Sequence, residues 1–260
     1  MVVQREERVF GVGREGDSLG TPLYSEGATM RWEVGLLGGF SVVSGEKVVD
    51  LPIDSQRLVA FLALQGGRVR RAYVAGSLWL DFSQERAFGN LRSALWRLRR
   101  HTTDLVDADT HTLALASSAA IDVTTLIDSA DRLCSPESDC GEFELDPVPF
   151  TQELLPGWYE EWSVVHRERL RQRSLHALEA LAERLTTRGR YDMAIQASLA
   201  AIDLDPLRES SQRCLIRVHI AEGNYSEALT QYQHYRNQLH TELGITPSPH
   251  LQRLMSEIPG

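Results

Sequence analysis

Apolar positions recur with a strand-like period at the start of the patterned region and with a helical period after it. From Met30, "RWEVGLLGGFSVVSGEKVVDLP" contains short β-prone runs separated by turn signals at Gly38-Gly39 and Ser44-Gly45. Three segments with apolar residues three and four apart follow, and the first is closed by Gly66-Gly67. "DLVDADTHTLALA" then predicts two strands around an Asp-rich turn. The pattern therefore predicts several short strands, three helices and a β-hairpin.

The third of these helices, "SQERAFGNLRSALWRLRRH" at 83–101, has two chemically different sides. Ser83 is its expected N-cap, and Glu85 is the only acidic residue inside it. At a turn of 100° per residue, Ala87, Leu91, Ala94, Leu95 and Leu98 form one apolar stripe. Arg86, Gly89, Ser93, Trp96, Arg97 and Arg100 gather opposite that stripe, with Asn90 at one flank and Arg92 and Arg99 at the other.

A basic helix side is usually just a solvated surface. Here the acidic partners expected four residues away are almost absent, Trp96 stands among the arginines, and a hairpin follows at the appropriate place. The order of elements is that of a winged helix, in which the third helix enters the major groove and the hairpin approaches the backbone. The predicted DNA-contacting residues are Arg70, Arg71, Arg86, Asn90, Arg92, Ser93, Trp96, Arg97, Arg99, Arg100, Thr110, His111 and Thr112.

The second half of the chain is predicted to be helical. A short helix in 121–134 and an acidic loop lead to a long helical pattern that begins near Trp158. "GRYDMAIQASLAAIDLDP" and "GNYSEALTQYQHYRNQL" begin 34 residues apart, which is the tetratricopeptide period. The second unit has Tyr235 where a small residue is usual and His240 where Pro is usual. Ser248 before Pro249 is the expected cap of a terminal helix.

The predicted fold class is therefore mainly α with a small β component. A winged helix-turn-helix domain at 30–121, with a small N-terminal sheet, three helices and a hairpin wing, precedes a tetratricopeptide-like all-α domain at 122–260. Residues 1–29 are expected to form a flexible arm. That arm contains "GVGREG", which matches the dinucleotide fingerprint, but Gly20 and Pro22 break the helix that the fingerprint needs.

Composition narrows the function classes. The formal net charge of −9 argues against indiscriminate nucleic-acid binding by the whole surface, although it permits a local basic patch. No apolar run is long enough to span a membrane and no signal-peptide core is present, so we expect a soluble, cytoplasmic protein. Cys134, Cys140 and Cys214 lack the spacing of a zinc site and are expected to be reduced. No metal or other cofactor is predicted.

The chain resembles the Streptomyces antibiotic regulatory protein family, whose short members combine an OmpR-type winged helix with a bacterial transcriptional activator domain. The matching segments occur in the family's order from Met30 almost to the end: "LLGGFSV", "SQRLVAFLALQGGRV", "SLWLD", "NLRSALWRLRR", "ELLPGWYEEW", "RLRQRSLHALEALAERL", "GRYDMAIQASLAAIDLDPLRE" and "TELGITPSPHLQRL".

The resemblance implies a pathway-specific activator of a secondary-metabolite gene cluster, such as one for an antibiotic. Such an activator binds direct repeats near the −35 element and recruits RNA polymerase, including its main sigma factor. Direct repeats suggest a second protomer beside the first. By motif position, the resemblance assigns the basic recognition helix to Arg92, Arg97, Arg99 and Arg100.

Two departures from the family pattern affect the expected contacts. The wing carries "DTHTL" at 109–113 instead of a Gly-Tyr pair, which leaves Thr110, His111 and Thr112 to reach phosphates. Ser55 replaces a basic residue that is common before Gln56-Arg57, and we expect a phosphate contact to be missing there.

Two other function classes compete with this interpretation. An enzyme is not expected, because no nucleophile motif, P-loop or metal-ligand spacing is present, and His166 and His176 are ten residues apart rather than four. The alternative is a tetratricopeptide-type adaptor that does not bind DNA, which the acidic balance favours. Salt-dependent binding to promoter DNA separates that adaptor from an activator.

Overall fold

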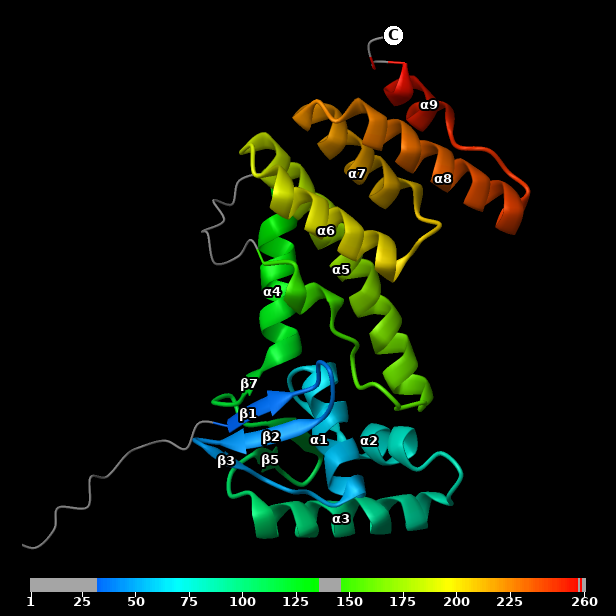
Figure 1. Cartoon of the computed structure of the whole chain (residues 1–260). Coiled ribbons are helices and arrows are strands. Elements are labelled where there is room, and N and C mark those ends of the chain that lie inside the picture. Colours follow the sequence, from blue (N-terminus) through cyan, green and yellow to red (C-terminus); the bar gives the residue numbers. More distant parts are fainter. Residues whose placement is uncertain (1–31, 136–145, 257, 259–260) are drawn as a thin grey trace, which may run out of the picture. The chain divides into compact units, whose positions relative to one another are not determined.

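The computed structural model describes residues 32–135, 146–256 and 258. The described residues from Trp32 onward belong to one compact unit, which is mainly helical with two small sheets, as predicted (Figure 1). The predicted N-terminal arm with its "GVGREG" segment, and Cys140 in the predicted acidic loop, lie outside the described residues. The division of the chain after Ile121 stays a prediction.

The N-terminal sheet is built from the strands that the turn signals predict. Strands β1 (Trp32–Gly35), β2 (Ser41–Ser44) and β3 (Lys47–Val48) pair antiparallel in sequence order. Within β1, Trp32 and Val34 are buried whereas Glu33 between them is exposed, which is the alternation of a half-buried strand. A fourth strand, β7 (Ala120–Ile121), pairs parallel with β1. The sheet order is β3-β2-β1-β7.

Three helices and a second sheet complete a winged helix. Helix α1 (Ile53–Gln65) ends at Gly66, whose φ of +62° favours glycine. Helices α2 (Arg71–Leu78) and α3 (Gln84–His101) follow. Strands β5 (Val106–Ala108) and β6 (Thr112–Leu115) form the predicted hairpin, and β4 (Val69–Arg70) adds to β6.

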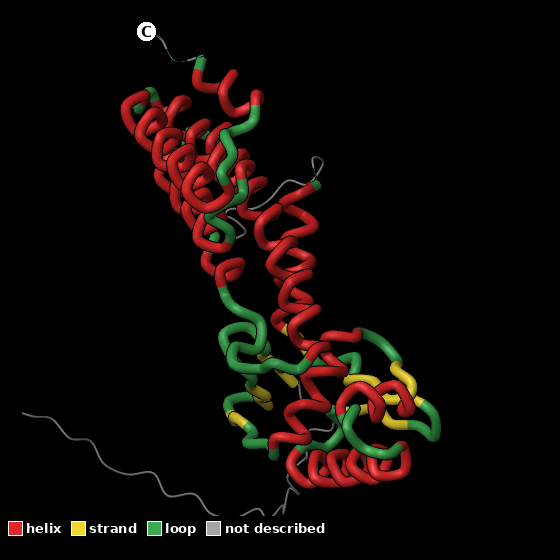
Figure 2. Tube along the Cα trace, turned by 90° about the vertical axis from the view of Figure 1, so that its right-hand side faces the viewer, coloured by secondary structure: helices red, strands yellow, loops and turns green. Residues whose placement is uncertain are grey.

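The second half consists of α4 (Asp122–Cys134), the short 3₁₀ helix η2 (Val148–Thr151), α5 (Glu161–Thr187), α6 (Tyr191–Leu204), α7 (Glu209–Glu222), α8 (Tyr225–Leu243) and α9 (Pro249–Met255). Helices α5 to α8 pack against one another in chain order (Figure 1), and Figure 2 shows helices packed side by side in this part of the chain. Ala194 and Ala228, which align in the two repeat units, are both fully buried. Small side chains at these positions let neighbouring helices approach closely. Ser248 caps α9, as predicted, because its hydroxyl accepts a hydrogen bond from the Leu251 N–H.

Tyr235, the bulky departure from the repeat pattern, is a core residue. Its side chain is 1% exposed, and its hydroxyl donates to the Leu207 carbonyl at 3.1 Å. It packs in a cluster of buried residues separate from the main core and formed by α7, α8 and α9: Ile216, Ala228, Tyr235, Leu239, Leu251 and Leu254. The large ring thus fills the region where the short terminal helix covers the end of the array.

Contacts distant in sequence join the winged helix to the helical half. The Leu155 N–H donates to the Leu36 carbonyl, and the Gly38 N–H donates to the Glu153 carbonyl, both at 2.8 Å. The Asp122 carboxylate at the start of α4 accepts from the Leu36 and Leu37 N–H groups. The segment that follows β1 is thus hydrogen-bonded to the loop before α5 and to the start of α4.

Aromatic packing and an ion pair strengthen the same junction. The ring of Trp162 meets Phe61 of α1 edge-on, with centroids 5.4 Å apart. Arg57 of α1 donates to Glu160, just before α5, at 2.8 Å. The two halves therefore share one continuous apolar core.

Candidate nucleic-acid interface

Helix α3 rests on the core through its apolar stripe. All five residues of the predicted stripe are buried: Ala87, Leu91, Ala94, Leu95 and Leu98. Ser83 is the N-cap, as predicted, and its hydroxyl accepts from the Arg86 N–H at 3.5 Å. The opposite side of α3 faces away from α1 and α2 (Figure 1). The burial pattern therefore confirms the predicted orientation of this helix.

The polar side of α3 carries most of the predicted contact residues. Asn90 is half-buried at the flank, and the hydroxyl of Ser93 donates to the Gly89 carbonyl at 3.0 Å, which leaves its oxygen free to accept. The other predicted contact residues on α3 are exposed: Arg86, Arg92, Trp96, Arg97, Arg99 and Arg100.

Two interactions modify this surface. The guanidinium carbon of Arg100 lies 5.0 Å from the centroid of the Trp96 ring, in a cation–π contact. Arg97 forms an ion pair with Asp54 at the start of α1, with 3.3 Å between the nitrogen and the oxygen. The Arg97 side chain remains 46% exposed, so this pair screens the arginine without removing it from the surface.

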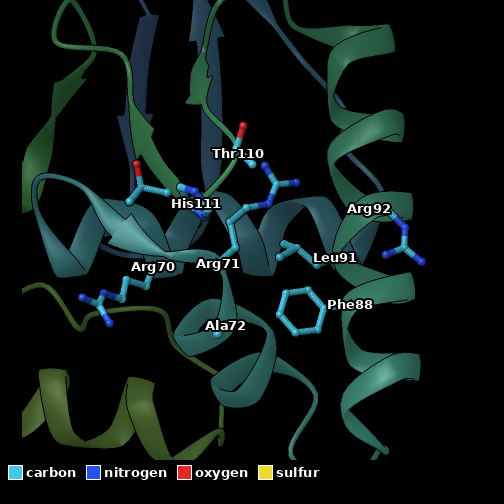
Figure 3. Close-up of a pocket in the computed structure, with 9 residues that line it drawn as sticks. Arg70, Arg71, Ala72, Phe88, Leu91, Arg92, Thr110 and His111 are labelled. Atoms are coloured by element: carbon cyan, nitrogen blue, oxygen red, sulfur yellow. The ribbon is translucent and has the colours of Figure 1, made fainter.

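A second group of predicted residues lines a groove beside α3, drawn in Figure 3 and called here the basic groove. Its volume is about 850 Å³. Phe88 and Leu91 project from α3 toward the start of α2 and form the apolar part of the lining (Figure 3). The groove is lined by Arg70, Arg71, Ala72, Phe88, Leu91, Arg92, Thr110, His111 and Thr112. It therefore brings six of the predicted residues, from β4, α2, α3 and the β5–β6 hairpin, to one place.

The hairpin tip is held by Asp109. Its carboxylate accepts from the Thr112 hydroxyl at 2.6 Å and from the N–H groups of Thr112 and His111. These hydrogen bonds, that of the Thr112 hydroxyl first, hold the pKa of Asp109 well below its usual range. Arg68 adds ion pairs to Asp107 and Asp109, each at 3.0 Å. The Asp-rich turn that replaces the family's Gly-Tyr pair thus has its own set of stabilising bonds.

The hairpin is also tied to the start of α2. The Arg71 N–H donates to the His111 carbonyl at 2.9 Å, and the Arg71 guanidinium donates to the Asp109 carbonyl at 2.8 Å. Thr110 and His111 remain exposed at the tip. Arg99 is not part of the basic groove, because it lines a separate depression between the end of α3 and strand β5.

Ser55 has a structural role that the sequence did not predict. Ser55 is fully buried, and its hydroxyl donates to the Ala94 carbonyl of α3 at 3.2 Å. It therefore joins α1 to the buried side of α3, and the expected absence of a phosphate contact at this position stays a prediction.

Sequence reasoning missed two charged residues near the interface. Arg68 was detectable only as a basic residue before an Asp-rich hairpin, and Asp54 as an acidic residue in the first turn of α1. Their partners are about forty residues away in the sequence. Short-range patterns carry no information about such pairs.

Metal sites and membrane-spanning helices are two other classes of feature that the described ranges could contain. No described group of three or more His, Cys, Asp or Glu residues is arranged to hold a metal ion. Within the same ranges, no helix has both the length and the apolar character that crossing a bilayer requires.

Comparisons with known proteins match this arrangement. Residues 149–259 match the family model of the bacterial transcriptional activator domain. The chain is 26% identical over 227 residues to the regulatory protein AfsR of Streptomyces coelicolor, an alignment that covers 82% of this chain and 23% of AfsR. The structure is similar to that of Mycobacterium tuberculosis EmbR, solved in complex with a low-affinity phosphopeptide, with a TM-score of 0.68 and 18% identity. That match covers 88% of this chain and 65% of the EmbR chain.

A winged helix followed by a bacterial transcriptional activator domain defines a class of bacterial transcriptional regulators. Within that class, the activator-domain match and the similarity to AfsR support the resemblance of the chain to the Streptomyces antibiotic regulatory protein family of transcriptional activators. It spans about a quarter of AfsR and about two thirds of the EmbR chain.

Proposed function

We propose that this chain is a sequence-specific activator that binds double-stranded promoter DNA through α3. The observation that carries the proposal is the two-sided character of α3: its leucines and alanines are buried, and its arginines project from the opposite side. A helix of this kind fits the major groove, which is about 12 Å wide. Arginine suits the role because its planar guanidinium forms paired hydrogen bonds with guanine edges and with phosphates.

The basic groove supplies the second part of the proposed interface. Arg70 and Arg71 lie at the start of α2, where N–H groups and the helix dipole favour an anion, and Arg92 of α3 lines the same groove. Thr110 and His111 lie across the groove on the hairpin. In the proposed complex a stretch of DNA backbone occupies this groove while α3 occupies the adjacent major groove. Phosphate contacts of this kind set the position of the protein, and base contacts select the sequence.

The charge distribution supports different roles for the two halves. Residues 30–121 carry 11 basic and 9 acidic residues, a net charge of +2, whereas residues 122–260 carry 13 basic and 22 acidic residues, a net charge of −9. Phosphates repel a surface as acidic as the second half. In our proposal residues 122–260 form a separate functional domain that faces RNA polymerase, with its main sigma factor, or a companion protomer on the adjacent direct repeat.

The resemblance to this family supports the biological setting of the proposal. We place the protein in the cytoplasm, where it activates a secondary-metabolite gene cluster from repeats near the −35 element. Transcript levels of the genes that flank its own gene, measured with and without the protein, test this setting.

Binding to promoter DNA, measured at a series of salt concentrations, tests the proposed function. DNA from upstream of the flanking genes should show protected direct repeats, and log Kobs should fall by about 0.9 per neutralised phosphate for each unit of log salt. A duplex of the same composition in scrambled order serves as control and should bind much more weakly. Failure of every upstream duplex to bind at low salt would favour the adaptor without DNA binding.

A further inference from the structure

Trp96 is a largely exposed tryptophan on the polar side of α3. Its side chain is 61% exposed, although a tryptophan has a large apolar surface to bury. At 100° per residue it lies within about 30° of the direction opposite the buried stripe of α3. Its neighbour Leu95 belongs to the buried stripe, whereas Arg97 is exposed. The indole therefore occupies the centre of the surface proposed to enter the major groove.

Arg100 lies one helical turn further along the same line. Its guanidinium carbon is 5.0 Å from the Trp96 ring centroid. No ion pair of Arg100 with a carboxylate occurs in the described part of the chain. Stacking on the indole restricts a side chain that would otherwise sample many rotamers, so less conformational entropy is lost when it binds. The pair thus presents an apolar surface and an oriented hydrogen-bond donor side by side.

We propose that Trp96 and Arg100 together read one thymine and one guanine in each DNA repeat. The C5 methyl of thymine is the apolar group that major-groove base edges present, and it is the natural partner of the indole. Guanine presents O6 and N7 to a guanidinium, which donates one hydrogen bond to each. This inference rests on the proposed DNA-binding function and adds to it the chemistry of the recognised bases.

The spacing of the two residues limits the spacing of the two bases. Four residues of α-helix rise about 6 Å, and base pairs are stacked about 3.4 Å apart. The thymine and the guanine therefore lie in base pairs that are no more than two steps apart. Two other arginines of α3 have different surroundings: Arg92 lines the basic groove, and Arg97 pairs with Asp54.

The experiment begins with selection of binding sites from random duplexes by the intact chain. Each thymine of the selected site is then replaced in turn by deoxyuridine, which pairs in the same way and lacks only the methyl group. For the wild type, one replacement in each repeat should weaken binding about fourfold, as expected for loss of one buried methyl group. The same replacement should leave the affinity of Trp96→Ala unchanged.

Two further variants complete the test. Arg100→Lys keeps the charge but loses the paired hydrogen bonds, so its selected sites should lose the guanine preference within two base pairs of that thymine. Tyr159→Ala removes an aromatic side chain that is 83% exposed and lies outside α3, and should keep the wild-type deoxyuridine profile. Because Trp96 is exposed, Trp96→Ala should keep the wild-type melting temperature, which is measured alongside.

The outcomes separate this inference from the proposed function. If random selection yields no preferred sequence, the proposed function itself fails. If a sequence is selected but tolerates deoxyuridine at every thymine, or if Trp96→Ala keeps the same deoxyuridine sensitivity, the assignment of thymine to Trp96 is overturned while DNA binding stands.

Discussion

At the scale of single residues, Asp54 is the carboxylate that most directly affects the proposed interface. It pairs with Arg97 at 3.3 Å, and the two side chains are 36% and 46% exposed. An ion pair this exposed contributes little to stability. Its negative charge nevertheless lies beside a surface that is proposed to approach phosphates. The pair therefore affects DNA affinity more than folding.

Replacing Asp54 by Asn should tighten DNA binding. Release of Arg97 and loss of one repulsive charge should raise affinity about two- to fivefold at low salt, the range expected for an exposed pair of roughly 0.3–1 kcal/mol. Titration of promoter DNA with each variant measures the change. Glu46→Gln removes an exposed acidic residue from the β2–β3 turn and serves as the charge-matched control. Equal affinities of Asp54→Asn and the wild type would show that Arg97 does not contribute.

Glu179 is the residue that most clearly links charge to stability. Its Oε1 atom accepts from the Arg208 guanidinium at 2.9 Å and from the hydroxyls of Ser210 and Ser211 at 2.6 and 2.8 Å. Burial alone raises the pKa of Glu179, but the hydrogen bonds from Arg208, Ser210 and Ser211 outweigh it and hold the pKa below the ordinary value of 4.5. The charged carboxylate of Glu179 therefore links α5 to the start of α7 through these hydrogen bonds.

Because this pKa is lowered in the folded state, the stabilisation is complete above pH 4.5 and is lost as the pH falls through the lower folded-state value. Glu179→Gln should lower the free energy of unfolding by about 1–3 kcal/mol at pH 7. The difference from the wild type should shrink below pH 4.5. Urea denaturation at several pH values measures both effects. Glu183→Gln, an exposed change on the same helix, should alter stability little; a constant difference at all pH values would contradict the assignment.

At the scale of secondary-structure elements, α3 and the repeat helices are encoded by local patterns. The buried stripe of α3 follows from the spacing of its leucines and alanines, and its start follows from Ser83. The turns of the repeat follow from Gly189 and Gly223, whose φ values are +71° and +87°. Each of these features depends on residues within about two helical turns, so the sequence alone was enough to predict them.

Other elements depend on contacts between distant segments. Strand β7 has only two residues and exists because it pairs with β1, which is about 87 residues earlier. Ser55 has an unremarkable sequence context, and its burial depends on the Ala94 carbonyl of α3. Of the candidate site, the polar side of α3 was predictable from its period. The basic groove was not, because it requires α2, α3 and the hairpin to meet.

The packing of α7, α8 and α9 at the end of the helical array is expected to depend on Tyr235. Tyr235 is buried, its hydroxyl donates to Leu207, and burial raises its pKa to about 12. Tyr235→Phe should lower the free energy of unfolding by about 0.5–1.5 kcal/mol through loss of this hydrogen bond. Tyr235→Ala should lower it by about 3–5 kcal/mol, because it also leaves a cavity.

Chemical denaturation followed by circular dichroism measures both variants. Tyr225→Phe, which removes the hydroxyl of a partly exposed tyrosine of α8, should stay close to the wild type. If Tyr235→Ala were as stable as the wild type, the end of the array would not depend on this ring.

At the scale of the whole molecule, a basic interface and an acidic helical half share one continuous core. Arg57 illustrates the connection, because it donates to Glu160 at 2.8 Å and to the Leu78 carbonyl at the end of α2 at 2.7 Å. The loop before α5 adds backbone hydrogen bonds to the segment that follows β1. We therefore expect the helical half to keep a fixed position relative to α3 when DNA binds. A fixed position would let the DNA repeat determine where the acidic half faces polymerase.

In our proposal α3 folds through one side and binds DNA through the other, and paired measurements on the same variants test this division of roles. Promoter affinity and melting temperature are measured for Arg92→Ala, Arg97→Ala and Leu95→Ala. Each arginine variant should lose affinity, by about 1–3 kcal/mol where the side chain reads a base, and keep nearly the wild-type melting temperature. Leu95→Ala should lose about 2–5 kcal/mol of folding stability, and its folded fraction should still bind. Arginine variants with wild-type promoter affinity and a lowered melting temperature would show that these side chains serve folding and not DNA binding.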